Sequence, residues 1–221
     1  MSKNKKRFGI KKFIFVPIVF CLIMYLSVLG IFLQDVSDIV SIGSMFLSDK
    51  QVDYSTAYEN IFVPTNINSD TVNAEDVEYP SINKQFGELK INNRDVSAKL
   101  FFGDGTIPLN NGVGVYAGSF IPGYGKTILV AGHNNTYFNG LKNVKKGDIV
   151  DIKTSYGNYQ YRVTGTKIAG KNDRSAYDLS AEDENLIMYT CYPFDELGLT
   201  ELRYFVYAEK VSGPEIVGIY E

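Results

Sequence analysis

Hydrophobic and polar positions follow three different patterns along the 221 residues of this chain. Residues 13–33 are apolar and carry no charge, whereas residues 34–80 are polar and acidic. Residues 81–221 alternate short apolar runs with Gly, Asn, Asp and Pro, a pattern typical of β-strands bounded by turns. The chain is therefore predicted to contain a membrane segment, a linker and a β-rich domain, in that order.

In the third region the pattern predicts strands that are separated by turns. They are 86–91, 97–102, 127–132, 149–154, 159–169, 185–191 and 202–211. Tyr156-Gly157-Asn158 is predicted to join two of them in a hairpin, and short helical turns fit residues 105–111 and 173–183. Seven or eight short strands with few helices favour a closed or nearly closed, antiparallel-rich barrel.

The net charge of −3 is distributed unevenly. Residues 1–12 carry six Lys or Arg and no acid, which leaves −9 for the rest of the chain. Nine acids against a single Lys place −8 of this charge in residues 34–80. No basic stripe lies outside residues 1–12, so nucleic acid is not an expected partner.

The apolar run 13–33 has 21 residues and as a helix would span about 31 Å, close to the hydrocarbon thickness of a bilayer. Basic residues precede it and Asp residues follow it, which places the N-terminus in the cytoplasm by the positive-inside rule. The alternatives are a cleaved signal peptide and a buried core helix, but the end of the run lacks a small-x-small cleavage site.

We therefore expect a protein of the cell membrane with a single span. Its parts are a cytoplasmic basic tail (1–12), a transmembrane anchor (13–33), an acidic extracellular linker (34–80) and an extracellular folded domain (81–221).

Of the two cysteines, only Cys191 lies outside the predicted membrane segment. Cys21 is inside it, so Cys191 has no partner for an intrachain disulfide on the outer side. A single thiol in an exported domain is a candidate reactive group. The alternative is a buried Cys that acts as a small hydrophobic residue.

The only histidine, His133, directly follows the apolar strand 127–132, and Cys191 ends the strand 185–191. If both strands end on one rim of the barrel, imidazole and thiol come together. A thiolate is the reactive form of Cys, and His donates and accepts protons near neutral pH. The alternative for His133 is a surface or core side chain with an ordinary hydrogen bond.

Arg203 is the candidate for stabilising an oxyanion, because a guanidinium is always charged and donates from a rigid fork. It lies on the last predicted strand, and a hairpin centred near residue 197 would place it opposite Cys191. The alternative is a solvated charge that pairs with Glu201 or Glu209.

The sequence shows neither a metal site nor a phosphate loop. One His and one outer Cys do not make a typical zinc site. The acidic run Glu182-Asp183-Glu184 offers oxygen ligands for Ca²⁺, but a solvated charged turn is the favoured interpretation. We expect no required cofactor, and an effect of a divalent cation stays open.

Two stretches surround the candidate His and Cys: Ala131-Gly132-His133-Asn134-Asn135-Thr136 and Thr190-Cys191-Tyr192-Pro193-Phe194. They resemble the histidine and cysteine regions of the sortase family of cysteine transpeptidases, and of class D sortases most of all. Arg203 follows at the expected distance. The resemblance covers roughly residues 81–212 and implies a closed eight-stranded sortase-type β-barrel with short helices. With the N-terminal transmembrane helix predicted from residues 13–33, the expected fold class is mainly β.

The resemblance also implies the reaction. Cys191 is expected to attack the Thr carbonyl of an LPxTG-like sorting signal near the C-terminus of a secreted protein. Arg203 helps to stabilise the oxyanion or position the substrate, and His133 protonates the leaving Gly amine. The thioacyl enzyme then transfers the protein to an amine on a peptidoglycan precursor or another amine acceptor.

By position, Ala131, Tyr189 and Thr190 are expected to line the peptide groove, although plain barrel packing explains them equally well. The loops 171–184 and 193–200 are the expected specificity elements. Ile187 and Met188 stand where the family usually has Thr and Leu, so the preferred sorting motif is left open.

Two other functions are compatible with an anchored domain that carries one thiol. A cysteine L,D-transpeptidase typically shows a Ser-x-Gly-Cys-x-Arg signature, whereas here Thr190 precedes Cys191 and the next Arg is Arg203. The other is a noncatalytic extracellular binding domain.

Overall fold

The computed structural model describes residues 15, 17–28, 62–63, 69–194, 196 and 200–218. The chain divides into two compact units, Met1–Val52 and Asp53–Glu221. In the first unit, residues 15 and 17–28 are helical and their side chains are exposed. Among the described residues, no helix is both long and apolar enough to cross a membrane.

Much of the predicted N-terminal organisation lies outside the described residues. This applies to the basic tail 1–12, to the ends of the predicted anchor 13–33, and to residues 34–61 and 64–68 of the predicted linker. The transmembrane anchor and its orientation stay predictions.

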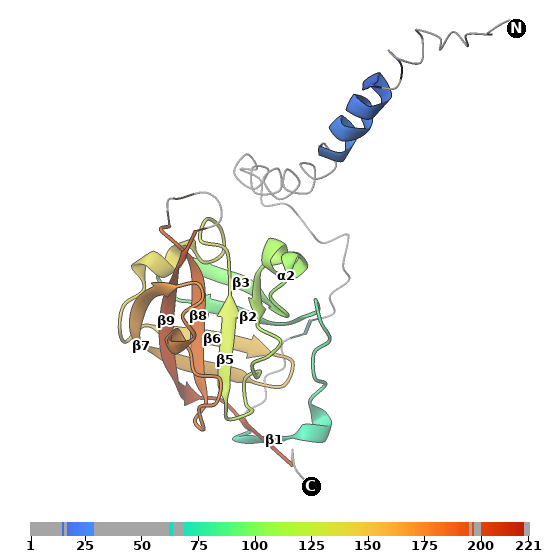
Figure 1. Cartoon of the computed structure of the whole chain (residues 1–221). Helices are drawn as coiled ribbons and strands as arrows, with labels where there is room; N and C mark the ends of the chain where they lie inside the picture. Colours follow the sequence, from blue (N-terminus) through green and yellow to red (C-terminus); the bar gives the residue numbers. More distant parts are fainter. Residues whose placement is uncertain are drawn as a thin grey trace, which may run out of the picture. The chain divides into compact units, whose positions relative to one another are not determined.

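A closed barrel of eight strands forms the body of the second unit (Figure 1). The order around the barrel is β2-β3-β4-β5-β8-β9-β7-β6. The strands are β2 Gln85–Ile91, β3 Val96–Phe102, β4 Val113–Val115, β5 Thr127–Ala131, β6 Ile149–Thr154, β7 Asn158–Gly170, β8 Asn185–Tyr192 and β9 Leu202–Ser212. The pairs β3–β4 and β5–β8 are parallel and the others antiparallel. The predicted mainly β, closed eight-stranded barrel is confirmed.

The folded unit also contains short helices. They are α2 Thr106–Asn111 and the 3₁₀ turns η2 Ala74–Asp76, η3 Asn139–Asn143 and η4 Arg174–Ala176. The helical turn predicted at 105–111 is α2, whereas only η4 is helical within 173–183.

The seven predicted strands are all present, and their ends differ from the prediction by at most one residue. The hairpin predicted at Tyr156-Gly157-Asn158 joins β6 and β7 and is closed by the Thr154 N–H, which donates to the Gly157 carbonyl at 2.9 Å. The sequence pattern misses β4, which is only three residues long. At its centre, a side chain on Gly114 would collide with the Gly103 carbonyl, so glycine allows the close approach of the neighbouring backbone.

A two-stranded parallel sheet joins the beginning and the end of the folded unit. β1 (Thr71–Asn73) pairs with β10 (Glu215–Val217), and Val72 and Ile216 are buried between this sheet and the barrel core. Residues 69–80, which the sequence assigns to the linker, are thus packed as part of the folded unit.

The barrel interior is filled by large apolar side chains. Fully buried examples are Leu89, Leu100, Ile128, Ile152, Tyr159, Tyr161, Leu186 and Met188. Because each such side chain contributes about 1.5–3 kcal/mol when it leaves water, this core dominates the stability of the barrel.

Glu184 stands immediately before β8 and carries a buried carboxylate, with only 4% of its side chain exposed. Its oxygens accept hydrogen bonds from the N–H groups of Gly123 and Gly125 at 3.1 Å, from the Tyr161 hydroxyl at 2.6 Å and from Lys210 Nζ at 3.2 Å. The expectation of a solvated charged turn is therefore wrong for Glu184, because its position before β8 places the carboxylate among these donors.

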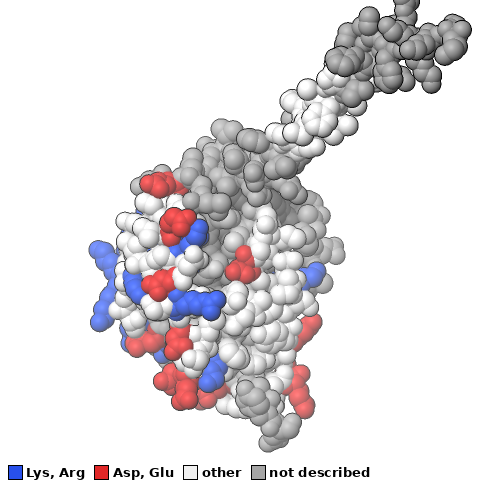
Figure 2. All heavy atoms as spheres, viewed as in Figure 1, with Lys and Arg blue, Asp and Glu red and all other residues white. Residues whose placement is uncertain are grey.

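An open pocket of about 500 Å³ lies beside Glu184. Glu182, Asp183, Glu209 and Glu215 also line it, and Figure 2 shows acidic side chains gathered towards the lower end of the view. Within the described residues, no group of three or more His, Cys, Asp and Glu side chains is arranged to hold a metal ion.

We expect Glu184→Ala to lower the free energy of unfolding by roughly 3–5 kcal/mol, because Lys210 loses its buried counter-charge and two N–H groups lose their acceptor. Urea unfolding followed by circular dichroism measures the change. Glu182→Ala is the matched control, and it should leave stability nearly unchanged because Glu182 is exposed. Equal stability of the two variants would contradict the role given to Glu184.

Candidate active site

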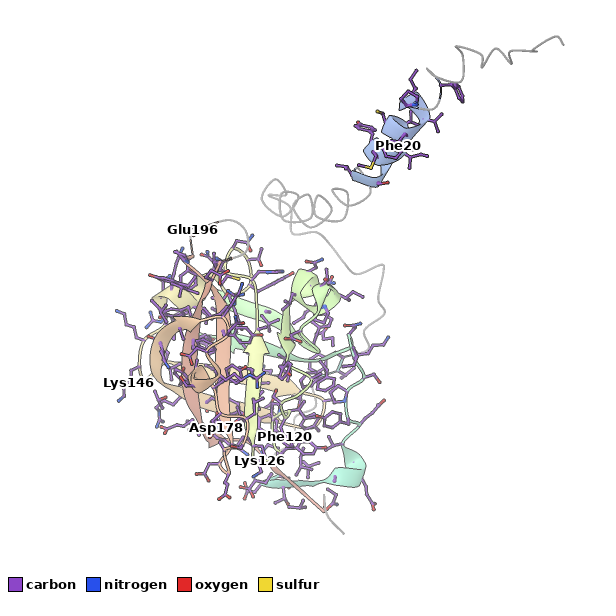
Figure 3. The ribbon with its side chains drawn as sticks, in the orientation of Figure 1. Phe20, Phe120, Lys126, Lys146, Asp178 and Glu196 are labelled. Atoms are coloured by element: carbon purple, nitrogen blue, oxygen red, sulfur yellow. The ribbon has the colours of Figure 1, made fainter. Side chains whose placement is uncertain are left out.

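The two ends of the barrel carry different parts of the chain. Lys126 and Asp178, which precede β5 and β8, lie towards one end, and Glu196, in the loop after β8, lies at the other (Figure 3). β5 and β8 run between these ends in the same direction. The residues that follow β5 and those that end β8 therefore gather at the end that carries Glu196.

Strand β8 presents Cys191 on the outer surface of the barrel wall. Met188 and Thr190 are 0% and 1% exposed, whereas Tyr189 and Cys191 are partly exposed. Because successive side chains of a strand point to opposite faces, Met188 and Thr190 face the interior and Tyr189 and Cys191 face outwards.

Arg203 lies directly opposite Cys191 in the antiparallel pair β8–β9, so the predicted register is confirmed. Residues that face each other in this way have Cβ atoms about 4.5–5.5 Å apart on the same face of the sheet. Nη1 of Arg203 donates to the Thr200 and Leu202 carbonyls, each at 2.8 Å. Within the described residues, its Nε and Nη2 groups are left available for a further acceptor.

His133 follows the end of the parallel pair β5–β8. The last residues of that pair are Ala131 and Tyr189, so it ends two residues before both His133 and Cys191. The Gly132 N–H donates to the Tyr189 carbonyl at 3.2 Å and extends the ladder by one residue. The two strands therefore end on one rim, which is the condition for imidazole and thiol to meet.

The loop after β5 is folded back tightly at His133. A side chain at Gly132 would collide with the ring of Phe138, and the Phe138 N–H donates to the His133 carbonyl at 3.0 Å. Burial lowers the pKa of His133 below its ordinary value of 6.5, because the imidazolium loses hydration. The imidazole is therefore mainly neutral at neutral pH.

Two hydrogen bonds connect the loop that carries His133 to the strand end that carries Cys191. The Thr190 hydroxyl donates to the Gly132 carbonyl at 2.7 Å. Nδ2 of Asn134 donates to the Pro193 carbonyl at 2.9 Å.

A second apolar cluster lies on the outer face of the wall formed by β5, β8 and β9. Its buried members are Leu129, Ala169, Ala176, Ile187 and Phe205. The rings of Tyr177, Phe205 and Tyr189 stack in a row, with centroid separations of 6.4 and 5.7 Å. Ala176 and Tyr177 belong to the loop 171–184, so this predicted specificity element does contribute to the outer wall.

Tyr189 connects this surface to the loop after β3. Its hydroxyl donates to Asp104 Oδ2 at 3.5 Å. Burial, and then the Asp104 carboxylate, raise the pKa of Tyr189 above its ordinary value of 10, while Arg203 opposes the rise. Tyr189 therefore stays a neutral hydrogen-bond donor close to both charges.

The three predicted groove residues occupy different environments. Tyr189 is on the outer wall and partly exposed. Ala131, its partner on β5, is 5% exposed. Thr190 is 1% exposed and its hydroxyl is already bonded to Gly132. The contacts of Ala131 and Thr190 in this structure are therefore packing contacts within the barrel wall.

Sequence analysis does not single out Asp104 or Asn134. Asp104 stands between two glycines and reads as part of a turn, and no local pattern indicates that Tyr189 reaches it. The position of Asn134 directly after the only histidine is a usable signal, but its partner Pro193 lies 59 residues away.

Comparison with known proteins identifies the family. The sortase domain model matches residues 89–211. Sortase D from Bacillus subtilis (strain 168) is 34% identical over 133 residues, which are 60% of this chain and 67% of that protein. The resemblance to class D sortases is thereby confirmed.

Solved sortase structures share the barrel. SrtF sortase from Corynebacterium diphtheriae gives a TM-score of 0.57 at 20% identity, over 69% of this chain and 97% of its own. A Clostridium perfringens sortase D5 transpeptidase gives 0.54 at 19% identity, over 61% and 83% of the two chains. Listeria monocytogenes sortase A gives 0.53 at 25% identity, over 61% and 92%.

The family model covers more than half of the chain and includes β5, β8, the residues between them, and all but the last residue of β9. This chain belongs to the sortase family, whose members are cysteine transpeptidases.

Proposed function

We propose that this sortase cleaves an LPxTG-like sorting signal between Thr and Gly and transfers the protein to a cell-wall amine, with Cys191, His133 and Arg203 as its catalytic residues. The observation that carries the proposal is the register of β8. It sets Cys191 opposite Arg203 on β9, and its parallel pairing with β5 ends two residues before both His133 and Cys191, which supports a site made of a nucleophile, a proton carrier and a cation.

The first half of the reaction forms a thioester. As Sγ of Cys191 attacks the Thr carbonyl carbon, the thiol proton passes to the neutral imidazole of His133. The available guanidinium donors of Arg203 stabilise the oxyanion of the tetrahedral intermediate. The Thr–Gly C–N bond then breaks, and the imidazolium gives its proton to the leaving amine.

The second half returns the enzyme to its starting state. The amine acceptor attacks the thioester carbon and gives a proton to His133, while Arg203 again faces the oxyanion. The C–S bond breaks, and the proton returns from the imidazolium to the Cys191 sulfur. The covalent intermediate thus splits one difficult transfer into two easier steps.

The apolar outer wall is proposed to receive the sorting signal. The ring row Tyr177–Phe205–Tyr189 crosses β9 and β8 where Phe205 pairs with Tyr189, two residues before Cys191 on β8, and apolar and aromatic side chains with a few polar groups are typical of ligand sites. Tyr189 supplies a hydroxyl at this wall, and Ala131 and Thr190 support it from the adjoining strand and from the interior.

The partners and location follow from the sequence. The charge-free run 13–33, with basic residues before it, supports a membrane anchor with the N-terminus in the cytoplasm. The domain would then meet secreted proteins and peptidoglycan precursors on the outer side. Membership of the sortase family excludes the assignment to the cysteine L,D-transpeptidases.

The first test is to incubate the purified protein with LPxTG-type peptides and an amine acceptor and to analyse it by mass spectrometry. A thioacyl adduct on Cys191 that passes to the amine is expected. Cys191→Ala should lower turnover by at least roughly 10⁴-fold because the nucleophile is lost. Cys21→Ala, which removes the other thiol, is the matched control and should retain activity.

Undiminished turnover by Cys191→Ala would contradict the proposed role of Cys191 as the nucleophile. A folded wild-type protein that forms no adduct with any such peptide would instead favour the noncatalytic binding domain.

Arg203→Ala is expected to lower kcat by about 10²–10³-fold, because a charged donor to the oxyanion is lost. Arg203→Lys should recover only part of this, since the ammonium keeps the charge but lacks the planar fork. Steady-state kinetics separate kcat from KM. Arg162→Lys, an exposed change on β7, is the control. Arg203→Ala with normal kcat and a raised KM would assign Arg203 to substrate binding alone.

The pH dependence follows from the lowered pKa of His133. Burial disfavours the imidazolium, so the group protonates only below its ordinary value of 6.5. NMR can follow this titration without ambiguity because the chain has a single His. The midpoint should lie below 6.5, and the acidic limb of kcat/KM should coincide with it. A midpoint above 6.5 would mean that a partner stabilises the imidazolium, contrary to this structure.

A further inference from the structure

The ladder between β5 and β8 ends just before the residues on which the proposed reaction depends. Its last paired residues are Ala131 and Tyr189, and one more backbone bond joins Gly132 to Tyr189. His133 and Cys191 lie beyond it. The separation of imidazole and thiol therefore depends on contacts other than this ladder.

Side chains next to both residues supply those contacts. Gly132 and Asn134 bracket His133, and Thr190 and Pro193 bracket the end of β8. The bond from Thr190 to Gly132 is 2.7 Å long, and the bond from Asn134 to Pro193 is 2.9 Å long. The bond from Thr190 joins two segments that the backbone bond between Gly132 and Tyr189 already joins. The bond from Asn134 instead joins the loop after β5 to the loop after β8.

Asn134 is held from both sides. It is 8% exposed, its side chain donates to Pro193, and its backbone carbonyl accepts from Nδ2 of Asn139 at 2.8 Å. Asn139 begins the turn η3, so the loop of His133 is braced against the next helical turn along the chain. A buried amide with good partners has one preferred position, since moving it leaves polar groups unpaired.

We propose that Asn134 is a positioning residue of this sortase, and that its amide clamps the His133 loop to the chain just after Cys191 so that imidazole and thiol stay within reach of each other. This inference deepens the function proposed above and depends on it. The side-chain amide of Asn134 is bonded to the Pro193 carbonyl. It acts through His133, and a displacement of about 1 Å in such a pair can lower a rate by 10²-fold.

The test uses Asn134→Ala and Asn134→Asp in the purified protein with Cys21→Ala as background. Asn134→Asp keeps the size of the side chain but replaces the donor with an acceptor that repels the Pro193 carbonyl. Asn135→Ala is the matched control, because it is the same residue type in the same loop. We expect kcat with an LPxTG-type peptide to fall by about 10- to 100-fold in both Asn134 variants, with KM within about twofold of wild type and no change for the control.

Two readouts separate positioning from simple loss of stability. The NMR titration of the single His should move towards 6.5 in the Asn134 variants, because a released imidazole gains hydration. The pH profile of Cys191 alkylation by iodoacetamide should change with it. Both are measured well below the unfolding temperature of each variant.

Wild-type kcat, alkylation profile and His titration in a folded Asn134 variant would overturn the proposal, whatever its unfolding temperature. The alkylation and NMR measurements need no peptide substrate. They therefore decide the role of Asn134 even if no sorting signal is found, while the absence of an adduct on wild-type Cys191 would count against the proposed function alone.

Discussion

The pairing of β8 with its two neighbours is the constraint on which the rest of the site depends. Parallel pairing with β5 brings two strand ends to one rim, and antiparallel pairing with β9 returns Arg203 to a place opposite Cys191. A slip of one residue would turn every side chain of a strand to the other face. Met188 on β8 and Val206 on β9, both fully buried, resist such a slip because they would leave the core.

Side-chain to backbone bonds fasten β5 and β8 together at both of their ends. At the start, Glu184 accepts from Gly123 and Gly125 in the segment before β5. At the finish, Asn134 in the loop after β5 donates to Pro193 after β8. At the start of the strand pair, the buried carboxylate of Glu184 is fully paired. At its end, the thiol of Cys191 is partly exposed. Stability and chemistry are thus placed at opposite ends of one strand pair.

Periodicity in the sequence was sufficient for the long strands. The run 159–169 begins with a clear alternation of apolar and polar residues, and 202–211 contains a continuous apolar and aromatic stretch; both are long enough to define their type and nearly their ends. The three-residue strands β1, β4 and β10 are too short for alternation to show, and their pairing depends on partners elsewhere in the chain. Glu184 was misjudged because three consecutive acids look alike in sequence, although only one of them meets Tyr161 and Lys210.

By itself, the sequence determined the β-rich character, the seven principal strands, and the candidate residues Cys191, His133 and Arg203. The sequence could also predict the hairpin between β8 and β9, because a local turn sets the register of these two strands. Only the tertiary structure decided that β5 and β8 are parallel neighbours, that Tyr189 reaches Asp104, and that Asn134 faces Pro193. These contacts join residues 58 to 85 positions apart in the chain, and closure of the barrel, rather than any local pattern, brings them together.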